Sequence, residues 1–253
     1  MLLNRLVRGT VGKEDFVPSH IPVDYTACLA GNPNTGKSTV FNALTGLNQH
    51  TGNWPGKTVA RARGLYRHQG KNVAVVDLPG TYSLLASSPE EEVARDFICF
   101  GRPDCTVVIV DATCLERNLN LVLQVLEITA KTVICLNLMD QAERRGFHID
   151  VSKLSDELEV PIVPTVARNG RGLTSLKDRI NEIASNAVSC RPKMLRYPTD
   201  LEAAIGELES CLSLLSAEGP SKRWAALRLL EGDASAIAAI KQYGMDSNAV
   251  QGV

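Results

Sequence analysis

Residues 31–38 have the types and spacing of a phosphate-binding loop, because they read Gly-Asn-Pro-Asn-Thr-Gly-Lys-Ser and match G-x-x-x-x-G-K-[ST]. An apolar run precedes this loop at 25–30, and residues 39–44 follow it with helical spacing. A loop between a strand and a helix directs backbone N–H groups and the positive end of the helix dipole at an anion. Lys37 adds a charge for the β- and γ-phosphates, and Ser38 offers a hydroxyl to Mg²⁺. The expected phosphate-site residues are Gly31, Asn32, Pro33, Asn34, Thr35, Gly36, Lys37, Ser38 and Thr39.

Two positions further along the chain supply groups that a metal-bound triphosphate needs. The segment Asp77-Leu-Pro-Gly80 matches D-x-x-G at the end of an expected strand. There the Asp77 carboxylate can hold Mg²⁺ through water, and the Gly80 N–H can meet the γ-phosphate. Thr58 lies in the polar segment before the second expected strand, where its hydroxyl can reach Mg²⁺. The predicted Mg²⁺ ligands are therefore Ser38, Thr58 and Asp77.

Two more segments have the residues to recognise a base. Asn137-Leu-Met-Asp140 matches N-x-x-D at the end of an apolar run, and Asn137, Met139 and Asp140 are its expected binding residues. The Asp140 carboxylate can accept both N–H groups on the edge of guanine, a pattern that adenine does not offer. Thr165, Val166 and Ala167 follow the last expected strand, where a backbone N–H can bind the guanine carbonyl oxygen. D-x-x-G or N-x-x-D alone is a weak signal, but in this order, downstream of a complete phosphate loop, they indicate a guanine-nucleotide domain.

The elements that must position these motifs alternate between strand and helix. Expected strands cover 25–30, 59–68, 72–77, 105–111, 132–137 and 162–165, with helices after most of them. One helix should begin at Pro89 with Ser88 as its N-cap, and another covers 173–188. Residues 45–58 are expected to be irregular because of their glycines and Pro55. The sequence thus predicts an α/β fold, a Ras-like P-loop G domain with a mostly parallel six-stranded sheet.

The organisation of the rest of the chain follows from where the strands stop. Residues 1–22 are expected to be a leader, residues 23–189 the GTP-binding G domain, and residues 190–253 a small all-helical regulatory domain. The segment Thr199-Asp-Leu-Glu202 has the form of a capping box for the first helix of that last domain. Trp224 is expected in its core rather than as an anchor for a partner.

Composition excludes several classes of protein. The 253 residues carry a net charge of -1, which does not favour a nucleic-acid partner. No stretch of 18 apolar residues exists that would span a bilayer. The seven cysteines form no C-x-x-C pair and several lie in apolar runs, so they are expected to be buried thiols rather than metal ligands.

Longer segments of the sequence resemble the family of bacterial ferrous iron transport protein B (FeoB), in its cytosolic N-terminal portion. The resemblance rests on Gly31-Asn-Pro-Asn34, Gln49-His-Thr-Gly-Asn-Trp-Pro-Gly-Lys-Thr58, Asp77-Leu-Pro-Gly-Thr-Tyr-Ser-Leu84 and Glu91-Glu-Val-Ala-Arg-Asp-Phe-Ile98. It is weaker over 223–233, which is similar to that family's helical domain. It implies a GTPase that binds GTP and GDP and regulates or gates Fe²⁺ uptake at the cytoplasmic side of the bacterial inner membrane.

Further expectations come only from this resemblance. It implies that Thr58 lies in a first switch and that Asp77 and Gly80 open a second. It implies that Asn34 helps to coordinate K⁺, which would neutralise phosphate charge as the bond breaks; the alternative for Asn34 is a turn residue in a left-handed conformation. Asn34, Lys37, Thr58 and Gly80 are then the expected catalytic residues. The implied partners are a transmembrane iron-permeation region, absent from this chain, and small cytosolic Feo accessory proteins; a homo-oligomer is compatible with it.

Three positions depart from the usual pattern. Thr81 stands where Ras-like enzymes carry a water-orienting Gln, which predicts slow intrinsic turnover, on the order of 10⁻⁴–10⁻³ s⁻¹. Leu138 replaces a common Lys, so an aliphatic chain should pack on guanine. Val166 replaces a serine, and the lost hydroxyl is expected to loosen the base loop and to weaken guanine selectivity or speed GDP release.

Other interpretations stay open at this stage. A ribosome- or RNA-associated GTPase shares the generic motifs, although the net charge argues against it. A nucleotide sensor with negligible hydrolysis is the second alternative. Trp54 is either a reporter of the first switch or a loop aromatic that packs on the domain, and the acids at 90–92 either position water or favour a helix N-terminus.

Overall fold

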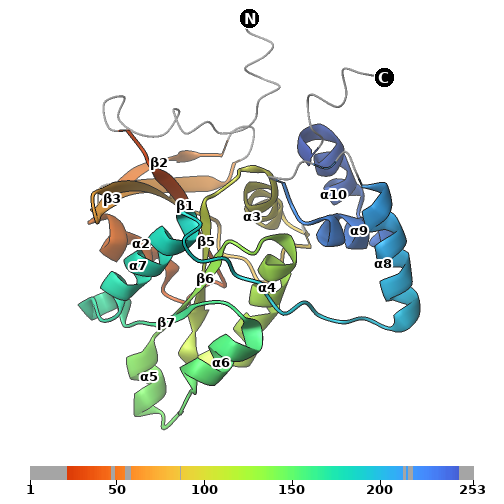
Figure 1. Ribbon diagram of the computed structural model, residues 1–253. Helices are drawn as coiled ribbons and strands as arrows, with labels where there is room; N and C mark the ends of the chain where they lie inside the picture. The colour runs from red at the N-terminus through yellow and green to blue at the C-terminus, as the bar shows by residue number, and fades with distance from the viewer. Residues whose placement is uncertain are drawn as a thin grey trace, which may run out of the picture.

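The computed structural model describes residues 22–46, 49–54, 58–85, 87–212, 215 and 219–244. Within these ranges helices cover both faces of a central sheet, and a further group of helices lies beside one covered face (Figure 1). The expected leader falls outside the described residues except for Pro22, and the expected boundary between residues 189 and 190 stays a prediction. No helix in the described ranges has the length and apolar character that a membrane span requires.

The sheet has the strand order β2-β3-β4-β1-β5-β6-β7. Its five strands from β4 to β7 in that order run parallel, and β2 and β3 are antiparallel to their neighbours. The strands are β1 (Tyr25–Gly31), β2 (Gln49–Asn53), β3 (Ala60–His68), β4 (Lys71–Asp77), β5 (Cys105–Asp111), β6 (Thr132–Asn137) and β7 (Ile162–Pro164). Because parallel strands end at the same edge, the segments that follow β1, β4, β6 and β7 meet there.

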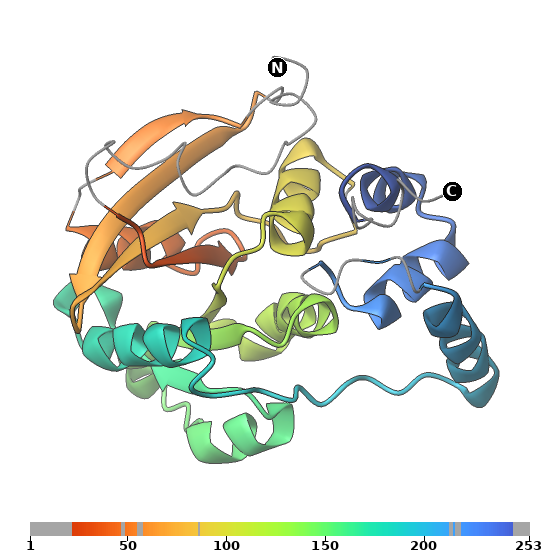
Figure 2. The same ribbon diagram turned by 45° about the horizontal axis from the view of Figure 1, so that its top comes forward.

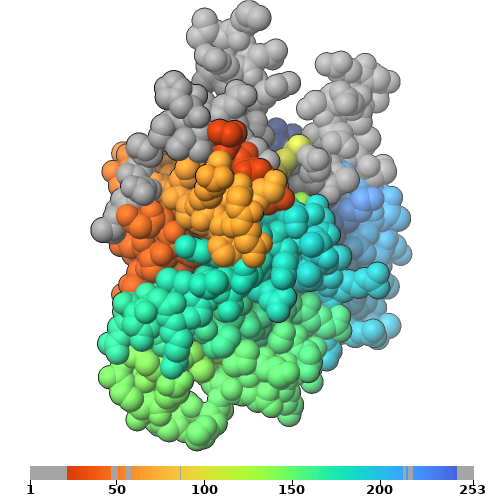
Figure 3. Space-filling view, turned by 60° about the vertical axis from the view of Figure 1, so that its left-hand side comes forward, coloured from red at the N-terminus to blue at the C-terminus, as the bar shows by residue number. Residues whose placement is uncertain are grey.

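Two apolar layers hold the helices on the sheet. On one face, α2 (Lys37–Thr45) and α7 (Leu173–Ala184) bury residues such as Phe41, Leu176 and Ile180. On the other, α3 (Pro89–Phe100) and α4 (Leu115–Ile128) bury residues such as Phe97 and Leu121. The remaining helices are α5 (Met139–Arg144), α6 (Val151–Leu158), α8 (Thr199–Cys211), α9 (Lys222–Glu231) and α10 (Ala234–Ala239). Figure 3 shows α7, in teal, between the orange strands and the green region of α5 and α6.

The prediction of six strands is wrong by one, since β2 forms in a segment expected to be irregular. Its residues pair with β3 in the register Gln49↔Gly64 to Asn53↔Ala60. The backbone partners of β2 all come from β3, so the pairing is tertiary and leaves no periodic signal in the sequence. Gly52 is tolerated there because the strand lies at the edge of the sheet.

The first and last residues of the helices show which capping signals in the sequence predicted a helix boundary correctly. The Ser88 side chain accepts a hydrogen bond from the Glu91 N–H at 3.2 Å, and Pro89 is the first helical residue, as predicted. The capping box at Thr199 is wrong in its first half, because Thr199 is already helical and Pro198 precedes it. Glu202 instead accepts from the Tyr197 N–H at 2.8 Å. The helix expected over 173–188 ends at Ala184.

The C-terminal helices share a core with the G domain. Trp224 is 3% exposed, as expected for a core residue, and it belongs with Ala236 and Ile240 to the same apolar cluster as α3 and α4. A smaller cluster of Ile205, Ala226 and Leu227 joins α8 to α9. Figure 2 shows α9 and α10 beside α3 and α4, with an extended segment, residues 185–198, leading from α7 to α8.

Candidate nucleotide-binding site

The predicted phosphate loop lies between β1 and α2, where the motif requires it. Gly36 is the N-cap of α2 with φ 83°, and it provides no side chain to cap the first-turn N–H groups. Asn34 also has a positive φ, 68°, and is exposed. Thr35 is buried and its hydroxyl donates to the Asn32 carbonyl oxygen at 2.9 Å, which fixes the turn. The loop therefore presents uncapped backbone donors at the edge where the other motifs arrive.

Lys37 and Asp77 form an ion pair between the phosphate loop and the end of β4. The pair uses Oδ1 of Asp77, and both side chains are largely buried. Burial raises the pKa of the Asp77 carboxyl, and the Lys37 charge opposes that rise. Ser38, by contrast, is exposed at the start of α2. The structure thus brings a carboxylate, an ammonium group and a hydroxyl to the first turn of one helix.

The D-x-x-G segment packs directly on the phosphate loop. The Thr81 N–H donates to the Gly31 carbonyl oxygen at 3.2 Å. A Cβ on Gly80 would lie 3.5 Å from Cα of Pro33, so even the smallest side chain at residue 80 would touch the phosphate loop. The Thr81 side chain is 3% exposed, and its hydroxyl donates to the Ser83 carbonyl oxygen at 2.5 Å. Residue 81 is therefore turned into the loop rather than toward solvent.

The acids at the start of α3 differ in what they contact. Glu91 accepts from the Ser87 N–H at 2.8 Å and lies 3.3 Å from the Thr81 hydroxyl, while Glu90 is exposed. Glu91 thus connects Thr81 to Ser87 in this structure. A role in holding water stays a prediction for these residues.

Asn137 connects the phosphate loop to the base loop. Asn137 is 1% exposed, and its Nδ2 donates to the Thr35 carbonyl oxygen at 3.0 Å. Its Oδ1 accepts from the Ala167 N–H at 3.1 Å and from the Thr165 hydroxyl at 3.2 Å. The Met139 N–H donates to the Thr165 carbonyl oxygen at 3.3 Å. All the predicted base-binding segments therefore meet through one buried amide.

Asp140 lies at the start of α5 beside two arginines that the motifs do not predict. Its Oδ2 accepts from Arg168 Nη2 at 2.6 Å and from Arg144 Nη2 at 3.0 Å. Its Oδ1 is buried and has no hydrogen-bond partner. Arg168 follows Ala167 directly in the sequence. This position next to the base-binding segment was the only sequence feature that could have pointed to a role for Arg168. Val166, expected to loosen the loop, is 1% exposed and its N–H donates to the Arg171 carbonyl oxygen at 3.0 Å.

The first switch segment is only partly joined to this site. Thr58 is exposed, and among the described residues no hydrogen bond links its side chain to the phosphate loop or to Asp77. Trp54 is buried and packs edge-on against Phe97 of α3, with ring centroids 5.3 Å apart. The indole therefore packs on the domain, as one of the two interpretations predicted.

The oxygen donors predicted for this site fit Mg²⁺ by their chemistry. Ser38 and Thr58 offer hydroxyls and Asp77 a carboxylate at the end of a strand, which is the ligand class that this hard cation prefers. The exposed amide oxygen of Asn34 suits a hard monovalent cation in the same way. In the part of the chain that the structure describes, no group of three or more His, Cys, Asp or Glu residues suggests another metal centre. Four of the seven cysteines are buried, as predicted, but the prediction is wrong for Cys114 and Cys211, which are exposed, and Cys190 is only partly buried.

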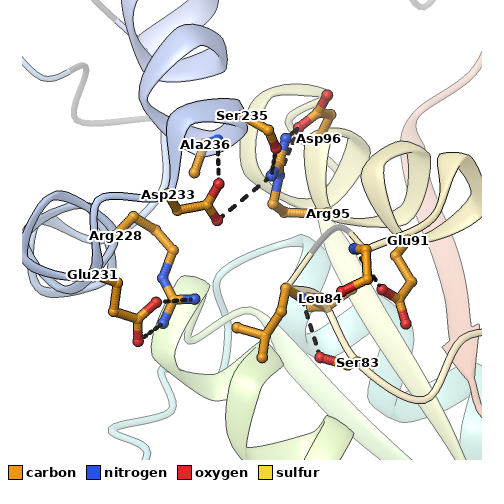
Figure 4. A network of polar contacts seen from close by, with 12 residues as sticks. Ser83, Leu84, Glu91, Arg95, Asp96, Arg228, Glu231, Asp233, Ser235 and Ala236 are labelled. Atoms are coloured by element: carbon orange, nitrogen blue, oxygen red, sulfur yellow. Dashed lines mark hydrogen bonds and ion pairs between the residues drawn. The ribbon is translucent and has the colours of Figure 1, made fainter.

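A polar network links α3 to the C-terminal helices. The Arg95 guanidinium is buried, donates to Asp96 at 2.7 Å and to the Ser235 hydroxyl at 2.6 Å, and lies 3.9 Å from Asp233 (Figure 4). On α4, Gln124 Oε1 accepts from the Leu84 N–H at 2.7 Å. The segment after the D-x-x-G motif is therefore in contact with both helices that pack on the C-terminal unit.

Two family models match this chain. One is that of ferrous iron transport protein B, over residues 25–180, and the other is that of the FeoB cytosolic helical domain, over residues 197–252. The Fe(2+) transporter FeoB of Shigella flexneri is 39% identical over 214 residues, and that of Salmonella choleraesuis is 41% identical. Each alignment covers 82% of this chain and 27% of the relative, so the chain spans about a quarter of the length of these relatives.

Solved structures give the same result. The crystal structure of the cytosolic domain of the T. maritima FeoB iron transporter in GDP form I has a TM-score of 0.79 and 34% identity, and the match covers 90% of both chains. The GMPPNP form of the same protein has a TM-score of 0.79 and 35% identity, with 86% of both chains covered.

Proposed function

This chain belongs to the FeoB family of ferrous iron transport proteins, and on that premise we propose that it binds GTP and GDP and hydrolyses GTP to regulate Fe²⁺ uptake. The proposal rests most directly on the meeting of four motifs at one sheet edge: the Asn137 side chain joins three of them, and the Lys37–Asp77 ion pair joins the D-x-x-G segment to the phosphate loop. It is supported by the GDP and GMPPNP forms of the T. maritima protein. A ribosome- or RNA-associated role has no comparable support.

Each motif has a task in the proposed reaction. The backbone donors of residues 31–38 and the Lys37 ammonium bind the β- and γ-phosphates, so Lys37 exchanges its Asp77 partner for phosphate. Ser38, Thr58 and Asp77 would hold Mg²⁺, which supplies charge neutralisation at the phosphates. Gly80 brings its N–H toward the γ-phosphate beside Pro33. Asn34 would contribute its amide oxygen to K⁺, and Asp140 and Ala167 read the guanine edge.

The proposed switch acts through the segment 81–91. Because Thr81 donates to Ser83 and contacts Glu91, a γ-phosphate that draws in Gly80 pulls on this turn. The same turn contacts α4 through Gln124 and continues into α3, which carries Arg95. We therefore propose that the C-terminal helices respond to the nucleotide and pass the change to a transmembrane iron-permeation region of the longer relatives, at the cytoplasmic side of the membrane. Small Feo accessory proteins and a homo-oligomer are further proposed partners.

Single-turnover GTP hydrolysis in K⁺ and in Na⁺ tests the proposal. The wild-type chain is expected to hydrolyse GTP slowly and faster in K⁺, and Asn34→Ala should remove the acceleration. Asn186→Ala is a matched control, since Asn186 also has a positive φ but lies after α7. Equal rates in the two salts, or acceleration that persists in Asn34→Ala, would contradict the cation mechanism. GTP that stays bound and uncleaved would favour the sensor without hydrolysis.

A further inference from the structure

The hydrogen bonds of Asp140 are distributed unequally between its two oxygens. Oδ2 accepts from Arg168 at 2.6 Å and from Arg144 at 3.0 Å, whereas Oδ1 is buried and has no partner. Arg144 is on the same helix and also donates Nε to the Asp140 carbonyl oxygen at 3.0 Å. Arg168 comes from the base loop. Of these two contacts, only that of Arg168 therefore ties the carboxylate to the base loop.

Val166 offers the Asp140 carboxylate no side-chain donor. A side chain at residue 166 without a hydroxyl has no donor for the carboxylate, and Val166 is buried. Two residues later, Arg168 reaches Asp140 with a side chain that is 63% exposed. The bonds that anchor the loop include those of Asn137 to the Ala167 N–H, of the Arg171 carbonyl oxygen to the Val166 N–H, and of Arg168 to Asp140.

We propose that Arg168 is a positioning residue that sets the guanine-reading geometry of Asp140. This inference rests on the proposed function. A carboxylate has about four lone-pair sites, and two arginines and the two N–H groups of guanine would use all of them. With Oδ2 held by the arginines, the orientation of the carboxylate is fixed and Oδ1 keeps its lone pairs for the base. Without Arg168, the carboxylate can rotate, so the second N–H of the base gains less from it.

The test compares GDP with IDP, because hypoxanthine lacks the 2-amino group that supplies the second donor. Binding of both nucleotides is measured by calorimetry for wild-type protein, Arg168→Ala and Arg168→Lys. Since the arginine is exposed, GDP binding of Arg168→Ala should weaken by about fivefold, with IDP affected less. The preference for GDP over IDP should therefore narrow, and Arg168→Lys, which keeps one donor, should restore most of it.

Arg171→Ala provides the matched control. Arg171 Nη2 donates to Glu143 at 2.7 Å and so joins the same loop to the same helix without contacting Asp140. The Arg171→Ala variant should leave the ratio of the GDP and IDP affinities unchanged. In an Asp140→Asn background, Arg168→Ala should have no further effect, because the arginine acts through the carboxylate.

The outcomes separate this inference from the proposed function. A GDP/IDP ratio in Arg168→Ala equal to wild type, or an equal shift in Arg171→Ala, would overturn the positioning role alone. Wild-type protein that binds neither GDP nor GTP would overturn the proposed function and this role with it. The melting temperatures of the variants, measured without nucleotide, show that any shift arises in folded protein.

Discussion

Replacing Asn137 by Ala should destabilise the folded chain as well as weaken GDP binding. The side chain makes three buried hydrogen bonds, to the Thr35 carbonyl oxygen, the Ala167 N–H and the Thr165 hydroxyl. At about 1 kcal/mol for each bond lost, the free energy of unfolding should fall by about 3 kcal/mol. For a chain of this size that corresponds to a melting temperature lower by about 6–12 °C. The loss is smaller than the usual stability of a domain, so the variant should still fold.

Urea unfolding followed by tryptophan fluorescence measures this change, since Trp54 and Trp224 are both buried. Asn181→Ala is the control, because Asn181 is 8% exposed but its Nδ2 makes only one long bond, 3.4 Å, to the His68 carbonyl oxygen. That variant should lose less than about 1 kcal/mol and keep its GDP affinity. Equal destabilisation by the two variants, or normal GDP binding in folded Asn137→Ala, would refute the view that this amide organises the pocket.

Three further predictions address the base, the metal and pH. Asp140→Asn should weaken GTP binding and admit xanthine nucleotides, because the acceptor carboxylate becomes a donor-bearing amide; unchanged GTP affinity would remove Asp140 from the pocket. Ser38→Ala should impair Mg²⁺-dependent GDP binding, and a titration with the same Mg²⁺ dependence as wild type would exclude that ligand. The Arg223 guanidinium and the Tyr197 N–H lower the pKa of Glu202 from 4.5 to about 2, so its stabilisation is present above pH 4.5 and is lost as pH falls toward 2. Melting temperatures should therefore fall more steeply between pH 5 and pH 3 in wild type than in Glu202→Gln, and parallel curves would contradict this.

Most of the fold could be predicted because its signals are local. The buried runs of β1, β5 and β6 are continuous and apolar, and Ser88 and Pro89 mark a helix start that needs no tertiary context. β2 could not be predicted in this way, since this segment becomes a strand by pairing with β3 and has no local signal of its own. Thr199 is not the cap because the helix has already begun there and Pro198 holds the N-cap position; Glu202, the acid of the expected capping box, accepts instead from the Tyr197 N–H and from Arg223 on another helix at 2.7 Å.

The residues of the site also differ in whether the sequence could predict them. Lys37, Asp77 and Asp140 were expected from motif spacing, and the structure places them at one edge. Arg168 and Gln124 were not expected, because each acts on an atom of a residue far away in the sequence. The prediction for Val166 was based on incomplete information. The sequence shows that residue 166 has no hydroxyl, but it does not show the hydrogen bond from the Val166 N–H to the Arg171 carbonyl oxygen that holds the loop.

Some motif residues of this site are required by contacts between the motifs themselves. A Cβ on Gly36 would lie 2.5 Å from Nδ2 of Asn137, so the last glycine of the phosphate loop must be small because the N-x-x-D asparagine approaches it. That asparagine in turn holds the Thr35 carbonyl oxygen and the Ala167 N–H. With 1% exposure, Asn137 is occupied mainly by protein groups, whereas Asp140 keeps one oxygen without a partner. The order of the motifs is informative because residues about a hundred positions apart must fit one another before either can meet a nucleotide.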